Sequence, residues 1–273
     1  MSEERADGFF TQIGEAAENF FSALHSLVEF LGETVLATAD AILHPHRIRW
    51  RDTLKSMEVC GADGMPITFM ICFLTGIILA YQSAVQMHKY GADTFLPALI
   101  GCTIVRELGP LMAAIVAAGR SGSAFAAEIA TMKVSEELDA LRTMGFSTAR
   151  FLLIPKMIAM LAMLPLLTVI GDFVGIMGGL VIGVTELNIS FSNYLQLTRE
   201  WVSIKYFMEG VIKSYVFAWL IAVAGCWCGF STGNDAVAVG KATTRAVVIS
   251  ILLIVIADAV LAKIFSTFYG LGV

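Results

Sequence analysis

The stretch MPITFMICFLTGIILAYQSAVQM, residues 65–87, contains no charged side chain. A helix of about 20 apolar residues, rising about 1.5 Å per residue, crosses a hydrocarbon core about 30 Å thick. The whole chain agrees: 57% of its 273 residues are hydrophobic, 15% are charged, and the mean hydropathy is +0.77. Soluble domains average roughly 45–50% apolar and about 25% charged residues. The composition therefore excludes a soluble enzyme and predicts an all-α membrane protein.

Apolar stretches of similar length recur along the rest of the chain. We predict five transmembrane helices, at about 65–87, 94–118, 151–184, 206–230 and 246–268. The third is too long for one upright crossing, so it is either a tilted helix that continues beyond the bilayer or a helix kinked at Pro165. With the N-terminus in the cytoplasm, the inside segments hold 11 Lys and Arg and the outside segments hold 4. The positive-inside rule then places the C-terminus outside.

The N-terminal segment has the pattern of one long amphipathic helix, because apolar residues recur at helical spacing from Phe9 to Val35. Acidic residues interrupt it, which excludes a signal peptide. Helices that lie on lipid are usually rich in Lys and Arg, whereas this one is acidic, so packing in the membrane interface and packing against protein both remain open. We assign residues 1–55 to this helix and a basic junction, and residues 56–273 to the membrane domain.

A second amphipathic segment separates the second and third spans. Ser135 can cap a helix and Gly145 can end it. Its apolar stripe consists of Leu138, Leu141 and Met144. We predict a short cytoplasmic helix over 135–145 that either rests on the membrane surface or offers this stripe to a partner.

Charges within the spans are the most informative polar residues, since each costs about 2.5–3.5 kcal/mol to insert at mid-membrane. Arg106 and Glu107 lie near the centre of the second span, and Lys213 and Asp258 are candidate partners in the fourth and fifth. The ring of Pro110 clashes with the carbonyl four residues back, so the helix should kink or open at the charged pair. These residues form either a structural ion-pair network or a polar patch in a substrate pathway. Three charged residues nearer span ends or a glycine-rich face rank lower: Lys156, Asp172 and Glu209.

Other features of the spans are explained by packing. A glycine recurs every fourth residue on one face of the third span, which allows close approach of another helix within the chain or across a dimer axis; these are Gly171, Gly175, Gly179 and Gly183. The five scattered cysteines are typical of small apolar residues in membrane helices. The sequence has neither a complete P-loop nor a metal-binding helix motif. We therefore expect no catalytic residue, no metal site and no cofactor on this chain.

Several longer motifs follow one another from about residue 50 to the C-terminus. They are VRELGPL (105–111), AGRSGSA (118–124), AEI (127–129), EELDAL (136–141), IKS (212–214), GNDA (233–236) and ATTRAVV (242–248). In this order they resemble the MlaE (YrbE-like) permease family, the membrane subunit of MCE-associated ABC lipid transporters.

The resemblance implies an inner-membrane permease that works as a homodimer and is not itself an enzyme. Its expected partners are a cytoplasmic ABC ATPase similar to MlaF, which would bind ATP and Mg²⁺, a small STAS-domain protein similar to MlaB, and a ring of MCE-domain protein similar to MlaD. The family moves phospholipid between the inner and outer membranes and so maintains outer-membrane lipid asymmetry.

The resemblance also implies roles for individual residues. Arg106, Glu107, Lys213 and Asp258 match polar positions near the lipid-binding cavity. Arg106 and Lys213 would pair with the lipid phosphate, and the two carboxylates would hold them in place. The segment over 135–145 would be the coupling helix on the ATPase, with the residues Glu136, Glu137, Leu138, Asp139, Leu141 and Arg142.

Three alternatives remain open from sequence. Related systems handle sterols or other hydrophobic compounds, which leaves the substrate undecided. A proton-coupled secondary transporter could use Glu107, Asp172 and Asp258 as a relay. A scaffold that anchors an MCE ring without moving lipid would tolerate neutral replacement of these charges. The acidic N-terminus favours a bacterial protein over one imported into an organelle.

Overall fold

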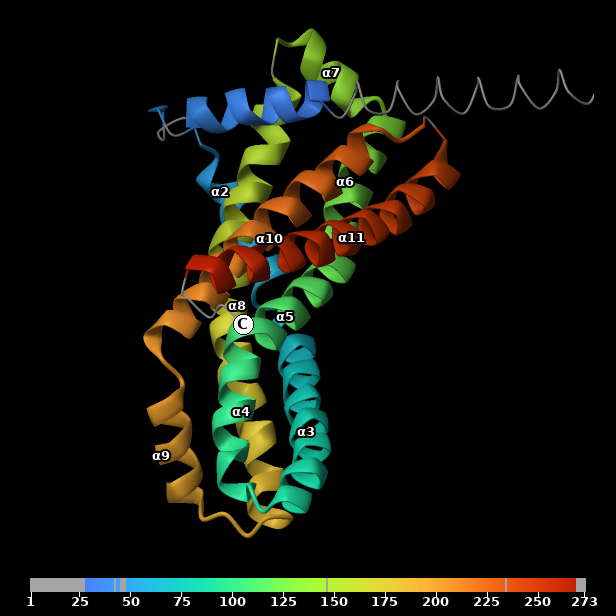
Figure 1. Cartoon of the computed structure of the whole chain (residues 1–273). Coiled ribbons are helices and arrows are strands. Elements are labelled where there is room, and N and C mark those ends of the chain that lie inside the picture. The colour runs from blue at the N-terminus through green and yellow to red at the C-terminus, as the bar shows by residue number, and fades with distance from the viewer. Residues whose placement is uncertain (1–27, 42, 45–47, 146, 234, 269–273) are drawn as a thin grey trace, which may run out of the picture.

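The computed structural model describes residues 28–41, 43–44, 48–145, 147–233 and 235–268, which form helices joined by short turns (Figure 1). No β-strand occurs within these ranges, and the expected all-α membrane fold is confirmed. Residues 28–41 are helical. The elements after them are α2 (Trp50–Cys60), α3 (Met65–Tyr90), η2 (Asp93–Phe95), α4 (Leu96–Thr103), η3 (Ile104–Leu108), α5 (Gly109–Ala117), η4 (Ala118–Gly122), α6 (Ser123–Val134), α7 (Glu137–Thr143), η5 (Ala149–Leu153), α8 (Ile154–Thr185), α9 (Phe191–Trp201), α10 (Ile204–Phe230) and α11 (Ala236–Phe268).

Five helical stretches of the described chain are long and apolar enough to cross a membrane, as expected. Their bounds are Trp50–Tyr90, Asp93–Val134, Arg150–Thr185, Ile204–Phe230 and Ala236–Phe268. The second stretch continues past the predicted end at residue 118, because η4 and α6 extend the helix where a loop was expected. A π-helical turn at η4 accommodates the small and polar residues there. The Ser123 hydroxyl donates to the Gly119 carbonyl at 2.6 Å, which keeps this hydroxyl satisfied.

The third span, α8, is one uninterrupted helix that contains Pro165. Its 32 residues correspond to roughly 48 Å at 1.5 Å per residue. This length exceeds a hydrocarbon core of about 30 Å, so α8 extends beyond the bilayer.

α8 contacts α2, α3, α5 and α10 and so lies in the centre of the bundle. Its glycines face neighbouring helices. A Cβ placed on Gly76 of α3 would collide with the backbone of Gly175. A Cβ on Gly171 would lie 2.9 Å from the Cys72 sulfur. The α3 and α8 backbones therefore approach one another as closely as glycine allows.

The other two glycines of the repeat face α9 instead. A Cβ on Gly179 would lie 2.7 Å from the Tyr194 hydroxyl, and one on Gly183 would lie 3.0 Å from its ring. The Tyr194 hydroxyl also donates to the Ile176 carbonyl at 3.4 Å. The glycine face thus makes room for a fully buried aromatic side chain that attaches α9 to the bundle.

The two ends of the molecule carry different elements. The helix over 28–41 and α7 lie at one end, whereas α9 and the turn between α3 and α4 lie at the other (Figure 1). Residues 28–41 pack one face against protein: Phe30 and Thr34 are buried, and the rings of Phe30 and Phe230 are 5.8 Å apart. Leu36 on the same helix is exposed. The predicted helix before residue 28 lies outside the described residues.

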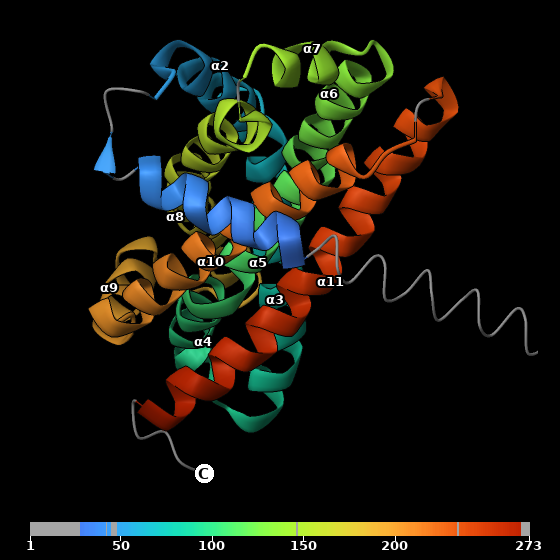
Figure 2. The same ribbon diagram turned by 90° about the horizontal axis from the view of Figure 1, so that it is seen from above.

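α11 runs obliquely along the outside of the bundle beside α10 (Figure 2). Of the five membrane-spanning stretches, the core segment of α11 is the most apolar and the least buried. Exposed side chains along it include Val248, Leu252, Val255, Val260 and Ile264. A large apolar helix face is therefore left uncovered by the rest of the described chain.

Candidate functional site

The helix of the second span opens where its charges lie, as the position of Pro110 predicts. Residues Ile104–Leu108 form the π-helix η3, and the Gly109 N–H donates to the Ile104 carbonyl five residues back. Pro110 has no N–H and cannot make the regular bond to residue 106. The wider turn presents Arg106 and Glu107 to the neighbouring helices. Single π-helical turns of this kind frequently mark functional sites.

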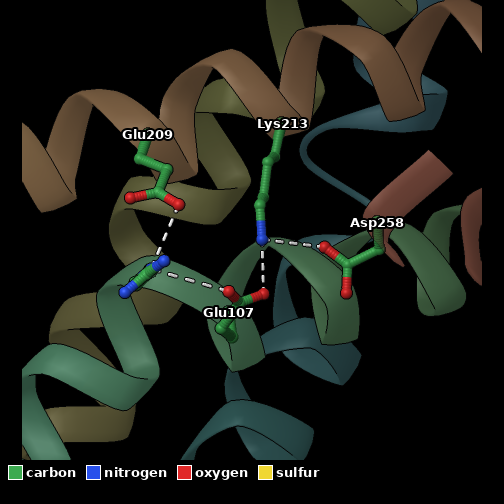
Figure 3. Close-up of polar contacts among 5 residues, drawn as sticks. Glu107, Glu209, Lys213 and Asp258 are labelled. Atoms are coloured by element: carbon green, nitrogen blue, oxygen red, sulfur yellow. Dashed lines mark hydrogen bonds and ion pairs between the residues drawn. The ribbon is translucent and has the colours of Figure 1, made fainter. Parts of the chain in front are cut away.

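Five charged side chains from three spans meet at this opening (Figure 3). Nε of Arg106 donates to Glu209 Oε1 at 3.0 Å and lies 3.6 Å from Glu107 Oε1. The Lys213 ammonium pairs with Glu107 Oε2 and lies 2.9 Å from Asp258 Oδ1. We call Arg106, Glu107, Glu209, Lys213 and Asp258 the five-residue network. It joins η3, α10 and α11 in the middle of an apolar bundle.

The members of the five-residue network differ in exposure. The side chains of Lys213 and Glu209, both from α10, are 0% and 1% exposed. Those of Asp258, Arg106 and Glu107 are 19%, 24% and 30% exposed. The network thus has a sealed side on α10 and an open side on η3 and α11. A ligand could reach only the open side in this conformation.

Sequence reasoning named four of these residues and ranked Glu209 too low. The signal for Glu209 was present, because it precedes Lys213 by four positions and so lies on the same face of α10. Tyr206 also lies near the network, with its ring centre 5.8 Å from the Arg106 guanidinium carbon. An aromatic ring at this distance favours a cation.

Among the described residues, the other two charged residues singled out from sequence form no ion pair with the network. Asp172 is buried on α8, and its Oδ1 atom has no hydrogen-bond partner within the described ranges. This oxygen lies against Gly109, where any Cβ would collide with it. Lys156 instead pairs with Glu128 of α6 at 2.5 Å. Lys156 therefore forms a second, separate link between spans.

The segment between the second and third spans is helical, but its start differs from the prediction. α7 covers Glu137–Thr143, preceded by Glu136 at φ 61°. The expected cap at Ser135 is wrong, because its hydroxyl donates back to the Thr131 carbonyl and closes α6. Gly145, at φ 80°, does follow the end of the helix. The polar residues of α7 are exposed, and Leu138 is its buried anchor.

No group of three or more His, Cys, Asp and Glu side chains is placed to hold a metal ion in the part of the chain that the structure describes. Cys226 and Cys228 are free and buried. The five-residue network presents both positive and negative groups, which can recognise a charged ligand.

Comparison with known proteins gives consistent matches. A family model described as Permease MlaE matches residues 53–264. A probable ABC transporter permease protein of Synechocystis sp. is 37% identical over 253 residues, covering 91% of this chain and 95% of its own. A similar protein of Rickettsia bellii is 35% identical over 230 residues, covering 84% and 88%. The intermembrane phospholipid transport system permease protein MlaE of Haemophilus influenzae is 30% identical over 271 residues, covering 97% and 98%.

Proposed function

The chain belongs to the MlaE permease family, and from this membership we propose that it is the membrane subunit of an ATP-driven transporter that moves phospholipid between the inner and outer membranes of a bacterium. The observation that carries the proposal is the similarity, over nearly the full length of both chains, to a permease named for intermembrane phospholipid transport. In this role the protein would maintain the lipid asymmetry of the outer membrane.

The proposed assembly contains two copies of this chain, an ABC ATPase similar to MlaF, a STAS-domain protein similar to MlaB, and an MCE-domain ring similar to MlaD. The second copy is implied by the family resemblance, and the uncovered apolar face of α11 suits contact with lipid or with such a copy. In a cavity between two copies, aliphatic side chains would contact the acyl chains of the lipid. The polar groups in its wall would be those of the five-residue network.

We propose that α7 is the coupling helix and that its end of the molecule faces the cytoplasm. The Lys and Arg bias between the loops supports this orientation. α7 presents exposed charges, including Asp139 and Arg142, to a docking partner. α7 packs on α6, and α6 contacts both α10 and α11. A displacement of α7 by the ATPase would therefore be transmitted to the helices that carry Lys213 and Asp258.

In this mechanism the chemistry of ATP hydrolysis occurs on another chain, and this chain changes its affinity for lipid. Arg106 would bind the lipid phosphate, since guanidinium forms two parallel hydrogen bonds with phosphate oxygens. Lys213 is enclosed and paired with two carboxylates, so we assign it the role of holding Glu107 and Asp258 in place. Relative movement of α6, α10 and α11 would then open or close the network around the headgroup.

Purification of the solubilised chain from its native membranes tests the assembly. We expect mass spectrometry to find an ABC ATPase, an MCE-domain protein and bound phospholipid with it. A chain that purifies without an ATPase and transports its substrate on a proton gradient would refute the proposal.

A charge exchange on α7 tests the coupling role. The double variant Asp139→Arg/Arg142→Asp keeps the net charge of α7 but exchanges the positions of the two charges. We expect the variant chain to insert in the membrane and to purify without the ATPase. Glu200→Lys on α9, an exposed charge at the opposite end, is the matched control and should retain the ATPase. Equal ATPase recovery from the double variant and the control would contradict the assignment.

A further inference from the structure

The charges of the five-residue network do not balance. Arg106 and Lys213 supply two positive charges, whereas Glu107, Glu209 and Asp258 supply three carboxylates. One negative charge is left in excess. Asp172 of α8, whose Oδ1 lies against Gly109, supplies no positive charge to offset this excess. An uncompensated charge inside a membrane protein is costly, so the site is expected to attract one more positive charge.

The excess charge lies on the open side of the network. Glu209 is sealed and is hydrogen-bonded to Nε of Arg106. Asp258 uses Oδ1 to face Lys213, and its other carboxylate oxygen points away from this ammonium (Figure 3). The partly exposed carboxylates of Asp258 and Glu107 are therefore the groups that an added cation can reach.

The same open side also presents one group suited to an anion. The hydrogen bond of Arg106 to Glu209 uses Nε, and neither terminal amino group of this guanidinium donates a hydrogen bond within the described residues. These amino groups can bind phosphate in the planar, two-bonded geometry typical of arginine. The open side therefore combines a phosphate-binding group with an excess of carboxylate.

We propose that this open side recognises the zwitterionic headgroup of an amine-bearing phospholipid, with the phosphate on Arg106 and the ammonium on Asp258 and Glu107. The inference rests on the proposed function and adds a headgroup class to it. The zwitterion adds no net charge to the site, and its ammonium places a positive charge beside the carboxylates that carry the excess. An anionic headgroup without an amine, such as that of phosphatidylglycerol, would bring a second negative charge to the same place and would bind less well.

Competition between two lipids tests the proposal on the intact complex. The complex is reconstituted in nanodiscs of equal phosphatidylethanolamine and phosphatidylglycerol, extracted, and its bound lipids are quantified by mass spectrometry. We expect the wild type to enrich phosphatidylethanolamine about tenfold over the bulk ratio, the factor that one charge-assisted contact of ordinary strength provides. Asp258→Asn should reduce this enrichment toward the bulk ratio while phospholipid is still bound. Asp63→Asn removes an exposed carboxylate that is paired elsewhere, with Arg120, and should leave the enrichment unchanged.

The possible results separate the two proposals. Equal binding of both lipids, or enrichment of phosphatidylglycerol, by a complex that still transports phospholipid would overturn the headgroup assignment alone. Unchanged enrichment in Asp258→Asn would also overturn it. A wild-type complex without bound phospholipid or ATP-driven lipid transport would refute the proposed function itself. If Asp258→Asn fails to fold, the wild-type competition still decides the headgroup assignment.

Discussion

Replacing Lys213 with methionine should strongly destabilise the protein, because this ammonium lies between two carboxylates and is fully buried. Methionine has a similar length but no charge, so Glu107 would retain only Arg106 nearby and Asp258 would lose its cation. Breaking a buried ion pair from one side costs about 3–5 kcal/mol, and the carboxylates of Glu107 and Asp258, which are 30% and 19% exposed, regain only part of their hydration. For a domain of this size each kcal/mol lowers the melting temperature by about 2–4 °C, so we expect a decrease of roughly 10 °C.

Lys156→Met is a matched control, since Lys156 is also a buried lysine of a membrane-spanning helix with a carboxylate partner. Its partner, Glu128, is 56% exposed and can regain water when the lysine is lost. An ion pair with such an exposed member is worth about 0–1 kcal/mol, so the melting temperature should fall by no more than about 4 °C.

The assay is thermal unfolding of both purified variants in the same detergent, followed by intrinsic fluorescence. Lys213→Met/Asp258→Leu should recover part of the loss, because it removes the carboxylate that has lost its cation. Equal decreases in melting temperature for Lys213→Met and Lys156→Met, or no recovery of the melting temperature in the double variant, would refute this explanation. Either result would show that burial of the partner carboxylates does not determine the loss of stability.

Three further predictions follow from packing and burial. Gly76→Ala should destabilise the protein by about 1–3 kcal/mol, because its Cβ would collide with the backbone of Gly175. Gly240→Ala is the control, since its Cβ meets open space, and thermal unfolding should show no decrease in its melting temperature. Burial raises the pKa of Tyr194, so above about pH 10 the native state retains a proton that the unfolded state loses. The free energy of unfolding should therefore fall as the pH rises through that range. In a series of unfolding measurements at different pH, Tyr194→Phe should remove this part of the decrease. Leu138→Lys should lower the local stability of α7, since Leu138 is its buried residue. We expect faster amide hydrogen exchange limited to residues 137–143. Unchanged exchange there would contradict the anchoring role of Leu138.

Much of the fold follows from local sequence. Five apolar stretches predict five spans because the thickness of the bilayer sets the length of a crossing helix. Pro110 predicts the opening at η3 because a proline lacks the N–H that a regular helix needs at that position. Helix ends were less predictable: Ser135 has the right type for an N-cap, but its hydroxyl bonds to the preceding helix instead. The extension of the second span to Val134 depends on a π-helical turn at η4, which has no simple sequence signal.

The sequence by itself determined that this is a five-span membrane protein of the MlaE family and that Arg106, Glu107, Lys213 and Asp258 are costly residues in need of partners. Only the tertiary structure decided which charges pair, that Glu209 joins them, and which side of the network stays open. Hydropathy depends on each segment alone, so it can be read locally. Pairing depends on the rotation and depth of each helix relative to the others. Those are set by packing contacts, such as Gly76 against Gly175, between residues far apart in the chain.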